Sequence, residues 1–304
     1  MKRGLLKMFA AALLCTAAMA ASAQPHLTQV REFGSNPGNL RMFYYVPEEL
    51  PANAPLVVVA HGCLGSADVI ATTSGWLEVA DRSGIALVFP ETSKHNEPWA
   101  GCFRTWEAAH AGRDAGEPLS VRQMIEYMRA LFPLDPARTY MTGTSSGGHL
   151  TNIMLVAYPE VFEAGAVQSA FPFGCATSAA DLAPCSAIAN ERTADELGDL
   201  IRGARPDHQG SWPRMQLWHG ELDEIIHYPN LAQLVLQWTN AQGIDAVPER
   251  EDDILSHPRA SYADADGRVL VEAVTVKGMG HAVAVDPGDA APQCGKVAPF
   301  VVDA

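Results

Sequence analysis

The sequence predicts an α/β fold in which a mostly parallel central sheet carries helices on both faces. Seven short runs rich in β-branched and aromatic residues are bounded by Gly, Pro or Asp, and most lack polar alternation, as strands covered on both faces do. Segments with helical apolar spacing lie between these runs, and alternating strands and helices indicate a parallel sheet. A length of 304 residues with 48% hydrophobic content is enough for one buried core.

The strand candidates have boundaries that the turn residues supply. They are residues 40–46, 56–60, 85–89, 138–142, 164–169, 215–219 and 269–276. One helical stripe runs from Val121 to Phe132, is introduced by Pro118 and closes before Pro133. A second stripe covers residues 231–238 and is closed by Gly243, and residues 149–155 read as the helix that follows the fourth strand.

Two long connections interrupt this alternation. Residues 171–212 contain Cys175 and Cys185 and a modest helix near residues 191–204, which predicts a small insertion over the end of the sheet, stapled by a Cys175–Cys185 disulfide. Residues 93–117 form the other. Aromatic candidates for a substrate groove on these two segments are Trp99, Phe103, Trp106 and Phe171, together with Phe173 and Trp212. Ordinary core packing is the alternative for at least half of them.

The N-terminal residues 1–23 predict a secretory signal peptide. Lys2, Arg3 and Lys7 form a basic start, an apolar middle follows, and small residues precede a cleavage site near Ala23. The apolar part is too short for a membrane anchor. We therefore expect residues 24–304 to form a single catalytic domain that is secreted to an extracellular or periplasmic space.

The charge balance argues against two classes of partner. Removing the three basic residues of the signal from 21 leaves 18 against 35 acidic residues, a net charge of −17. Such a surface repels phosphate backbones and anionic lipid, so we expect no nucleic-acid or membrane partner. Five cysteines remain in the mature chain, and export makes disulfides the default interpretation; the odd number leaves Cys294 without an assigned partner.

The sequence Gly143-Thr144-Ser145-Ser146-Gly147 matches the pattern G-x-S-x-G of a strand-to-helix turn that exposes a nucleophilic serine. Only Ser145 fits the register, because Thr144 stands two residues before Ser146. A purely structural turn is the alternative interpretation. The backbone N–H of Ser146, at the start of the helix, is then a candidate oxyanion donor.

Candidate catalytic partners for Ser145 come later in the sequence, first an acid and then a histidine. Folds that carry a serine on such a strand-to-helix turn use this chain order. The polar loop after the strand at residues 215–219 offers Asp223, with Glu221 and Glu224 as rivals, and His281 follows the last strand. His281 would take the proton of Ser145, and the acid would orient the imidazole. His61 and His219 also end strands and are interpreted as hydrogen-bonded structure; His149 and His227 have no assigned role.

The loop after residues 56–60 is the candidate source of a second backbone donor to the oxyanion. Gly62 permits a close approach, and the backbone N–H of Cys63 is the candidate second oxyanion donor. A Cys63–Cys102 disulfide would tie this loop to the aromatic segment, the alternative being a buried thiol. Nothing resembles a metal motif such as H-E-x-x-H, and we expect neither a metal nor a cofactor.

In these motifs the chain resembles the secreted esterases grouped with poly(3-hydroxybutyrate) depolymerases and the acetylxylan and feruloyl esterases of carbohydrate esterase family 1. The stretches "VVVAHGC", "TGTSSGGHLTNIMLVAYPEVFEAGAVQSAFPFGCA", "WHGELDEIIHYPNLAQLVLQWT" and "GMGHAVAVDPG" carry the resemblance, which spans most of residues 40–290. It implies an α/β-hydrolase fold and cofactor-free ester hydrolysis through an acyl-enzyme. It also favours Asp223 over the two glutamates as the triad acid.

Relatives of this kind often continue into a further helix that bears another cysteine, whereas this sequence ends at Ala304; the resemblance implies that the partner of Cys294 belongs to such a segment. No polymer-binding module follows, which weakens the expectation of efficient attack on solid polyester. The predicted function is a secreted serine esterase acting on an acylated plant polysaccharide or a polyester. The alternatives are a non-catalytic binding protein on the same scaffold and a serine peptidase.

Overall fold

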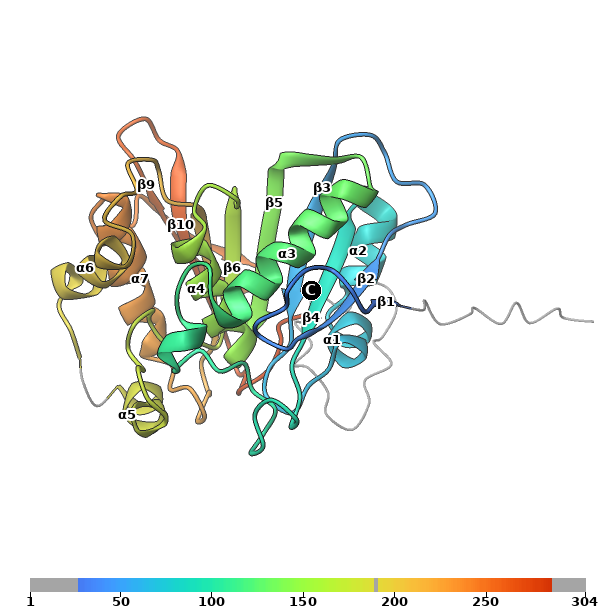
Figure 1. The fold of residues 1–304 in the computed structure, drawn as a ribbon. Helices are drawn as coiled ribbons and strands as arrows, with labels where there is room; N and C mark the ends of the chain where they lie inside the picture. Colours follow the sequence, from blue (N-terminus) through green and yellow to red (C-terminus); the bar gives the residue numbers. More distant parts are fainter. Residues whose placement is uncertain (1–26, 189–190, 286–304) are drawn as a thin grey trace, which may run out of the picture.

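The computed structural model describes residues 27–188 and 191–285, so the predicted signal peptide and Cys294 lie outside the described residues. One sheet of ten strands runs through this part of the chain, in the order β1-β2-β4-β3-β5-β6-β7-β10-β9-β8 (Figure 1). The strands are β1 (Thr28–Val30), β2 (Arg41–Tyr45), β3 (Ala54–Ala60), β4 (Ala86–Glu91), β5 (Leu134–Thr144), β6 (Ala164–Gln168), β7 (Arg214–Gly220), β8 (Arg250–Ile254), β9 (His257–Ala263) and β10 (Val269–Val276).

The six central strands, from β4 to β10 in sheet order, pair in parallel, and the strands at both edges pair antiparallel. The predicted mostly parallel sheet is therefore confirmed. Strands β1, β8 and β9 were not predicted. The sequence of β8, REDDI, has four charged residues, and β9 contains a proline, so neither has the composition of a strand. Strands β8 and β9 form because β9 pairs with β10 and β8 pairs with β9, and this pairing compensates for their low intrinsic strand propensity.

The helices cover both faces of the sheet, as predicted. They are α1 (Ala67–Thr73), α2 (Trp76–Ser83), α3 (Gly116–Leu131), α4 (Ser146–Ala157), α5 (Leu182–Ala187), α6 (Ala194–Ala204) and α7 (Asn230–Gln242), with 3-10 turns at Ala108–His110 and Ala179–Asp181. Helices α1 and α2 pack against β3 and β4, and α3, α4 and α7 pack on the other face. Among the residues that the structure describes, no helix is long and apolar enough to cross a bilayer.

Strand β3 explains why the central runs lack polar alternation. All seven of its residues are buried: Leu56 and Val58 join the core beneath α3 and α4, while Val57 and Val59 join the core beneath α1 and α2. Since successive side chains of a strand point to opposite faces, a strand covered on both faces has to be apolar throughout.

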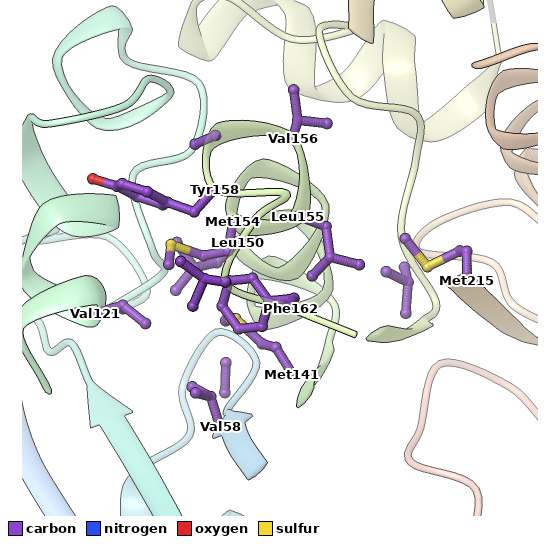
Figure 2. Packing of buried hydrophobic residues seen from close by; sticks show 14 of the residues in the cluster. Val58, Val121, Met141, Leu150, Met154, Leu155, Val156, Tyr158, Phe162 and Met215 are labelled. Carbon is purple, nitrogen blue, oxygen red and sulfur yellow. The ribbon is translucent and has the colours of Figure 1, made fainter. Parts of the chain in front are cut away.

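Helix α4 lies at the centre of the larger core, and all twelve of its residues are buried. Figure 2 shows Leu150, Met154 and Leu155 of this helix in one cluster with Val58 and Met141 from neighbouring strands. The helix is therefore held from all sides, and the turn that precedes it has a fixed position at the carboxyl ends of the parallel strands.

Candidate active site

Ser145 occupies the turn between β5 and α4 with φ 54° and ψ −122°, a backbone conformation that side-chain-bearing residues rarely adopt. The backbone N–H of Ser145 donates to the carbonyl of Gln168 at 2.9 Å, and its carbonyl accepts from the N–H of His149 at 3.0 Å. The side chain makes no capping hydrogen bond to the helix and is half-buried. This is the strand-turn-helix geometry that the G-x-S-x-G pattern predicts.

The glycines on either side of Ser145 are required by close backbone approach. A Cβ atom on Gly143 would collide with the carbonyl of Gly147, and a Cβ on Gly147 would collide with the carbonyls of Ala60 and His61. Neither neighbour is a flexible side-chain end that could move away. The turn therefore cannot form with larger residues at these two positions, which is the physical reason for the motif.

Asp223, in the loop after β7, is buried and receives several hydrogen bonds. Its Oδ1 accepts from the N–H groups of Ile225 at 3.0 Å and Ile226 at 2.9 Å, and Oδ2 lies 2.9 Å from Nδ1 of His281. Burial by itself would raise the pKa of Asp223, but the hydrogen bonds from His219, His281 and the Ile226 N–H outweigh it and hold the pKa well below its usual range. The carboxylate is therefore ionised at neutral pH.

The two rival carboxylates do not take this position. Glu221 and Glu224 are both exposed, and Glu221 accepts a hydrogen bond from the N–H of Gly278 at 3.2 Å. The carboxylate that meets the imidazole of His281 is that of Asp223.

The orientation of His281 follows from this contact. Because a carboxylate can only accept, Nδ1 carries the hydrogen, and in the neutral ring Nε2 keeps a lone pair on the far side. Gln168, at the end of β6, ties this loop to the serine turn: its side-chain oxygen accepts from the N–H of Ala284 at 3.1 Å, and its carbonyl accepts from Ser145. The three sequence-predicted residues thus lie at one edge of the sheet. Among the hydrogen bonds of residues 27–188 and 191–285, those of the His281 ring go to Asp223, and none joins the ring to the Ser145 hydroxyl. Hydrogen bonds between a catalytic serine and its histidine are often long without substrate and shorten when substrate binds.

The loop after β3 reaches the same edge. A Cβ built on Gly62 would lie 3.3 Å from the Cβ of Ser145, so the loop passes directly beside the serine. The predicted Cys63–Cys102 disulfide is present, and the N–H of Leu64 donates to the carbonyl of Ala100 at 2.7 Å. Among the hydrogen bonds of the described residues, the Cys63 N–H has no acceptor. Ser146 is the first residue of α4, where helical N–H groups lack an intrahelical acceptor.

Glu97 is a structural residue of this edge that sequence reasoning missed. Its buried carboxylate accepts from the backbone N–H groups of Trp99 at 3.0 Å and Ala100 at 2.7 Å. It thereby shapes the segment that is disulfide-bonded to Cys63. A single glutamate in a polar loop carries no sequence signal for such a role.

The predicted groove aromatics fall into different environments. Trp99 is 89% exposed and Trp106 is half-buried. The prediction that Phe103 lines a groove is wrong: it is fully buried, with its ring centroid 4.9 Å from that of His61, because the segment folds inward beside β3. Phe171 is also buried, 3.7 Å from the ring of His149, where both line a small cavity with Thr105.

The second predicted disulfide, Cys175–Cys185, is also present, within the insertion. This segment packs against the loop of Asp223: Phe171, Cys185 and Ile226 form one apolar cluster, and the N–H of His227 donates to the carbonyl of Ser186 at 2.9 Å. The insertion is therefore a support for the acid loop.

Two buried histidines support the surrounding loops. His61 contacts the carbonyl of Gly62 at 2.6 Å and the N–H of Thr92 at 3.2 Å, and burial lowers its pKa to about 4. His149, which had no assigned role, accepts from the N–H of Phe171 at 3.1 Å, and burial, together with the nearby His281, lowers its pKa to about 3. Both rings are therefore neutral at physiological pH.

The fold and this edge together define the class of protein. A serine on a strained turn after a parallel strand, followed along the chain by an aspartate and a histidine that meet at the carboxyl ends of the strands, is the arrangement of an α/β-hydrolase. The chain belongs to the Esterase PHB depolymerase family, whose model matches residues 41–253.

Several known proteins are similar to this chain. Poly(3-hydroxyalkanoate) depolymerase C of Paucimonas lemoignei is 38% identical over 97% of this chain and 70% of its own length. Feruloyl esterase B of Talaromyces funiculosus is 32% identical over 86% of this chain and 74% of its own length. The solved acetyl xylan esterase from Aspergillus awamori has a TM-score of 0.75 at 26% identity, over 84% of this chain and 94% of its own. The predicted family resemblance is confirmed, and with it the enzyme class, a carboxylic ester hydrolase.

Proposed function

We propose that Ser145, His281 and Asp223 are the catalytic triad of this esterase. The observation that carries the proposal is the Asp223–His281 hydrogen bond at 2.9 Å, formed at the sheet edge where Ser145 occupies its strained turn. Gln168 supports it by contacting the serine turn and the histidine loop at once.

The chemistry follows from the tautomer that Asp223 imposes. The lone pair on Nε2 of His281 takes the proton as the Ser145 oxygen attacks the ester carbonyl, and the ionised carboxylate stabilises the imidazolium that forms. The N–H groups of Cys63 and Ser146 donate to the oxyanion of the tetrahedral intermediate. The imidazolium then protonates the departing alcohol. Water, activated by the same histidine, releases the acid from Ser145.

The substrate class is proposed from the surface around this edge. Large apolar side chains are exposed on the loops that carry the site: Leu64 at 74%, Trp99 at 89%, Leu222 at 60% and Ile225 at 62%. Leu64 adjoins the candidate oxyanion donor and the other two aliphatic residues flank Asp223. An open apolar rim suits a polymer chain better than a small soluble ester. The proposed substrates are therefore carboxylic esters of polymers, with aliphatic polyester favoured over acylated polysaccharide because polysaccharide hydroxyls require polar partners.

The site of action is proposed to be outside the cytoplasm. The basic-apolar-small pattern of residues 1–23 supports export, and the Cys63–Cys102 and Cys175–Cys185 disulfides support an oxidising compartment. The relatives' names, which concern polyhydroxyalkanoate, feruloyl and acetylxylan esters, agree with a polymeric ester as partner.

A substrate panel tests the proposal. The wild-type protein and Ser145→Ala are each incubated with four substrates. Three are esters, namely amorphous polyhydroxybutyrate, acetylated xylan and methyl ferulate, and the fourth is an amide, an acyl p-nitroanilide. We expect hydrolysis of the esters, fastest on the polyester, and loss of turnover in the variant. Turnover confined to the amide would indicate a peptidase, and no turnover by folded wild-type protein would indicate a binding protein.

A further inference from the structure

The carboxylate of Asp223 has a second histidine neighbour that the triad does not include. His219, in β7, is fully buried, and its Nε2 lies 3.4 Å from Oδ2 of Asp223. The same Nε2 lies 2.7 Å from the carbonyl oxygen of Ile226. Two imidazoles thus approach the same aspartate, His219 from within the protein and His281 from the open edge.

The tautomer of His219 is set by these contacts. A carbonyl oxygen can only accept, so Nε2 carries the hydrogen and donates to Ile226, with the carboxylate of Asp223 next to the same N–H. The other ring nitrogen, Nδ1, is buried and has no hydrogen-bond partner within the described residues. Burying a polar atom without a partner costs free energy. An apolar residue would avoid that cost but would remove the donor that meets the Ile226 carbonyl and adjoins Asp223, so what the imidazole contributes here is the hydrogen on Nε2.

The Asp223 carboxylate shows what the imidazole provides. Oδ1 is fixed by two backbone donors, Ile225 and Ile226. Among the described residues, Oδ2 is approached by the two histidines alone, and one of them, His281, is the residue whose orientation the carboxylate must control. A carboxylate anchored only through Oδ1 can rotate with the imidazole; a donor on the inner side of Oδ2 opposes that rotation.

We propose that His219 is a positioning residue for the catalytic acid: its Nε2–H holds the Asp223 carboxylate and the Ile226 carbonyl in the arrangement that presents the carboxylate to Nδ1 of His281. This role rests on the proposed function of the triad. It also accounts for the i, i+4 spacing of His219 and Asp223 across the tight turn after β7, which the sequence alone does not distinguish from chance.

His61 provides a matched comparison inside the same molecule. It too is buried, follows a central strand and precedes a glycine, but its ring contacts the carbonyl of Gly62 and the N–H of Thr92 and, in the part of the chain that the structure describes, no carboxylate. A role in orienting Asp223 should therefore belong to His219 and not to His61, although both are buried histidines at strand ends.

The test measures steady-state ester hydrolysis by His219→Gln, His219→Asn and His219→Leu beside the wild-type protein. The Gln amide N–H reaches the position of the imidazole Nε2, the shorter Asn does not, and Leu has no donor. We expect Asn and Leu to lower kcat roughly 10- to 100-fold, the range of a hydrogen bond to a charged group, with KM within about twofold, and Gln to recover most of the rate.

A second readout follows the Asp223–His281 hydrogen bond itself. The deshielded Nδ1 proton of His281 in the proton NMR spectrum should shift or broaden in His219→Asn and keep its position in His61→Gln. Thermal melting verifies that each variant is folded, and the Asn variant keeps the test available if Leu prevents folding.

Each outcome decides between the two proposals. Inactive Ser145→Ala together with wild-type kcat in His219→Asn, or equal impairment of the Gln and Asn variants, would overturn the positioning role alone. Full activity of Ser145→Ala would overturn the proposed triad and this role with it.

Discussion

The two disulfides support opposite sides of the candidate active site, and they do so in different ways. Cys63–Cys102 is itself part of the loop that carries the candidate oxyanion donor, and it joins segments 39 residues apart. Cys175–Cys185 closes a loop of 10 residues in the insertion and reaches the acid loop only through packing on Ile226 and hydrogen bonds such as that from Asn230 to Ser186, at 3.0 Å.

Because of this difference, we expect the Cys63–Cys102 disulfide to affect catalysis directly and the Cys175–Cys185 disulfide to affect mainly the stability of the fold. On the oxyanion side, the covalent bond fixes the backbone whose N–H would meet the substrate. On the acid side, the groups that meet Asp223 come from its own loop, from β7 and from the loop after β10 that carries His281. The insertion packs against the acid loop through Ile226. Loss of the first disulfide should therefore change the rate as well as the stability, whereas loss of the second should change mainly the stability.

The largest effect is expected on the acid side itself. Asp223→Asn preserves shape but replaces an acceptor by an amide, which favours the wrong tautomer of His281. By analogy with the equivalent change in serine proteases, kcat should fall about 10⁴-fold. Glu221→Gln is the matched control, because Glu221 is exposed and contacts Gly278. Equal losses in both variants, measured with a soluble ester, would contradict the assignment of the acid.

The next effect is expected from the double change Cys63→Ser and Cys102→Ser. Misplacing one oxyanion donor should lower kcat about 100-fold. The free energy of unfolding should fall by about 4 kcal/mol, the loop-entropy value for a 39-residue separation. Denaturant titration and steady-state kinetics measure the two quantities. A stability loss with an unchanged kcat would show that the loop keeps its position without the bond.

The matching double change, Cys175→Ser and Cys185→Ser, should cost about 3 kcal/mol of unfolding free energy for its 10-residue separation. Because the insertion only covers the acid loop, kcat should stay within a few-fold of the wild-type value at temperatures where the variant is folded. A loss of kcat as large as that of the first pair would remove the distinction between the two sides.

The smallest effect concerns the buried histidines His61 and His149, one on each side. Their folded-state pKa values of about 4 and about 3 lie below the unfolded value near 6.5, so below pH 6.5 the unfolded chain binds protons that the folded chain does not. The free energy of unfolding that each neutral, buried imidazole contributes is therefore fully present above pH 6.5. It declines by about 1.4 kcal/mol per pH unit as the pH falls from 6.5 towards the folded-state pKa.

Replacing either histidine by Gln should therefore flatten the loss of stability between pH 6.5 and 4.5, which denaturant titrations at several pH values measure. A slope that is unchanged in His149→Gln would mean that this imidazole already binds a proton in the folded state.

The sequence predicted the parts of the site that local chemistry dictates. The turn at Ser145 needs glycines for contacts that the motif records, and His281 and Asp223 follow strands whose apolar composition marks them. The parts it missed depend on contacts between distant residues. Nothing in the sequence separates Phe103, which folds into the core, from Trp99, which is exposed, and Glu97 and His219 acquire partners only when the loops close. The charged strand β8 was missed because its pairing, not its composition, makes it a strand.

Covalent labelling gives the sharpest test of Ser145 as a nucleophile that His281 activates. A fluorophosphonate probe is incubated with the wild-type protein and with His281→Ala, and the modified peptide is mapped by mass spectrometry. We expect a label on the Ser145 oxygen, with a labelling rate that falls by orders of magnitude in the variant because the general base is gone. A label on Ser146 or any other residue, or undiminished labelling of Ser145 without His281, would contradict it.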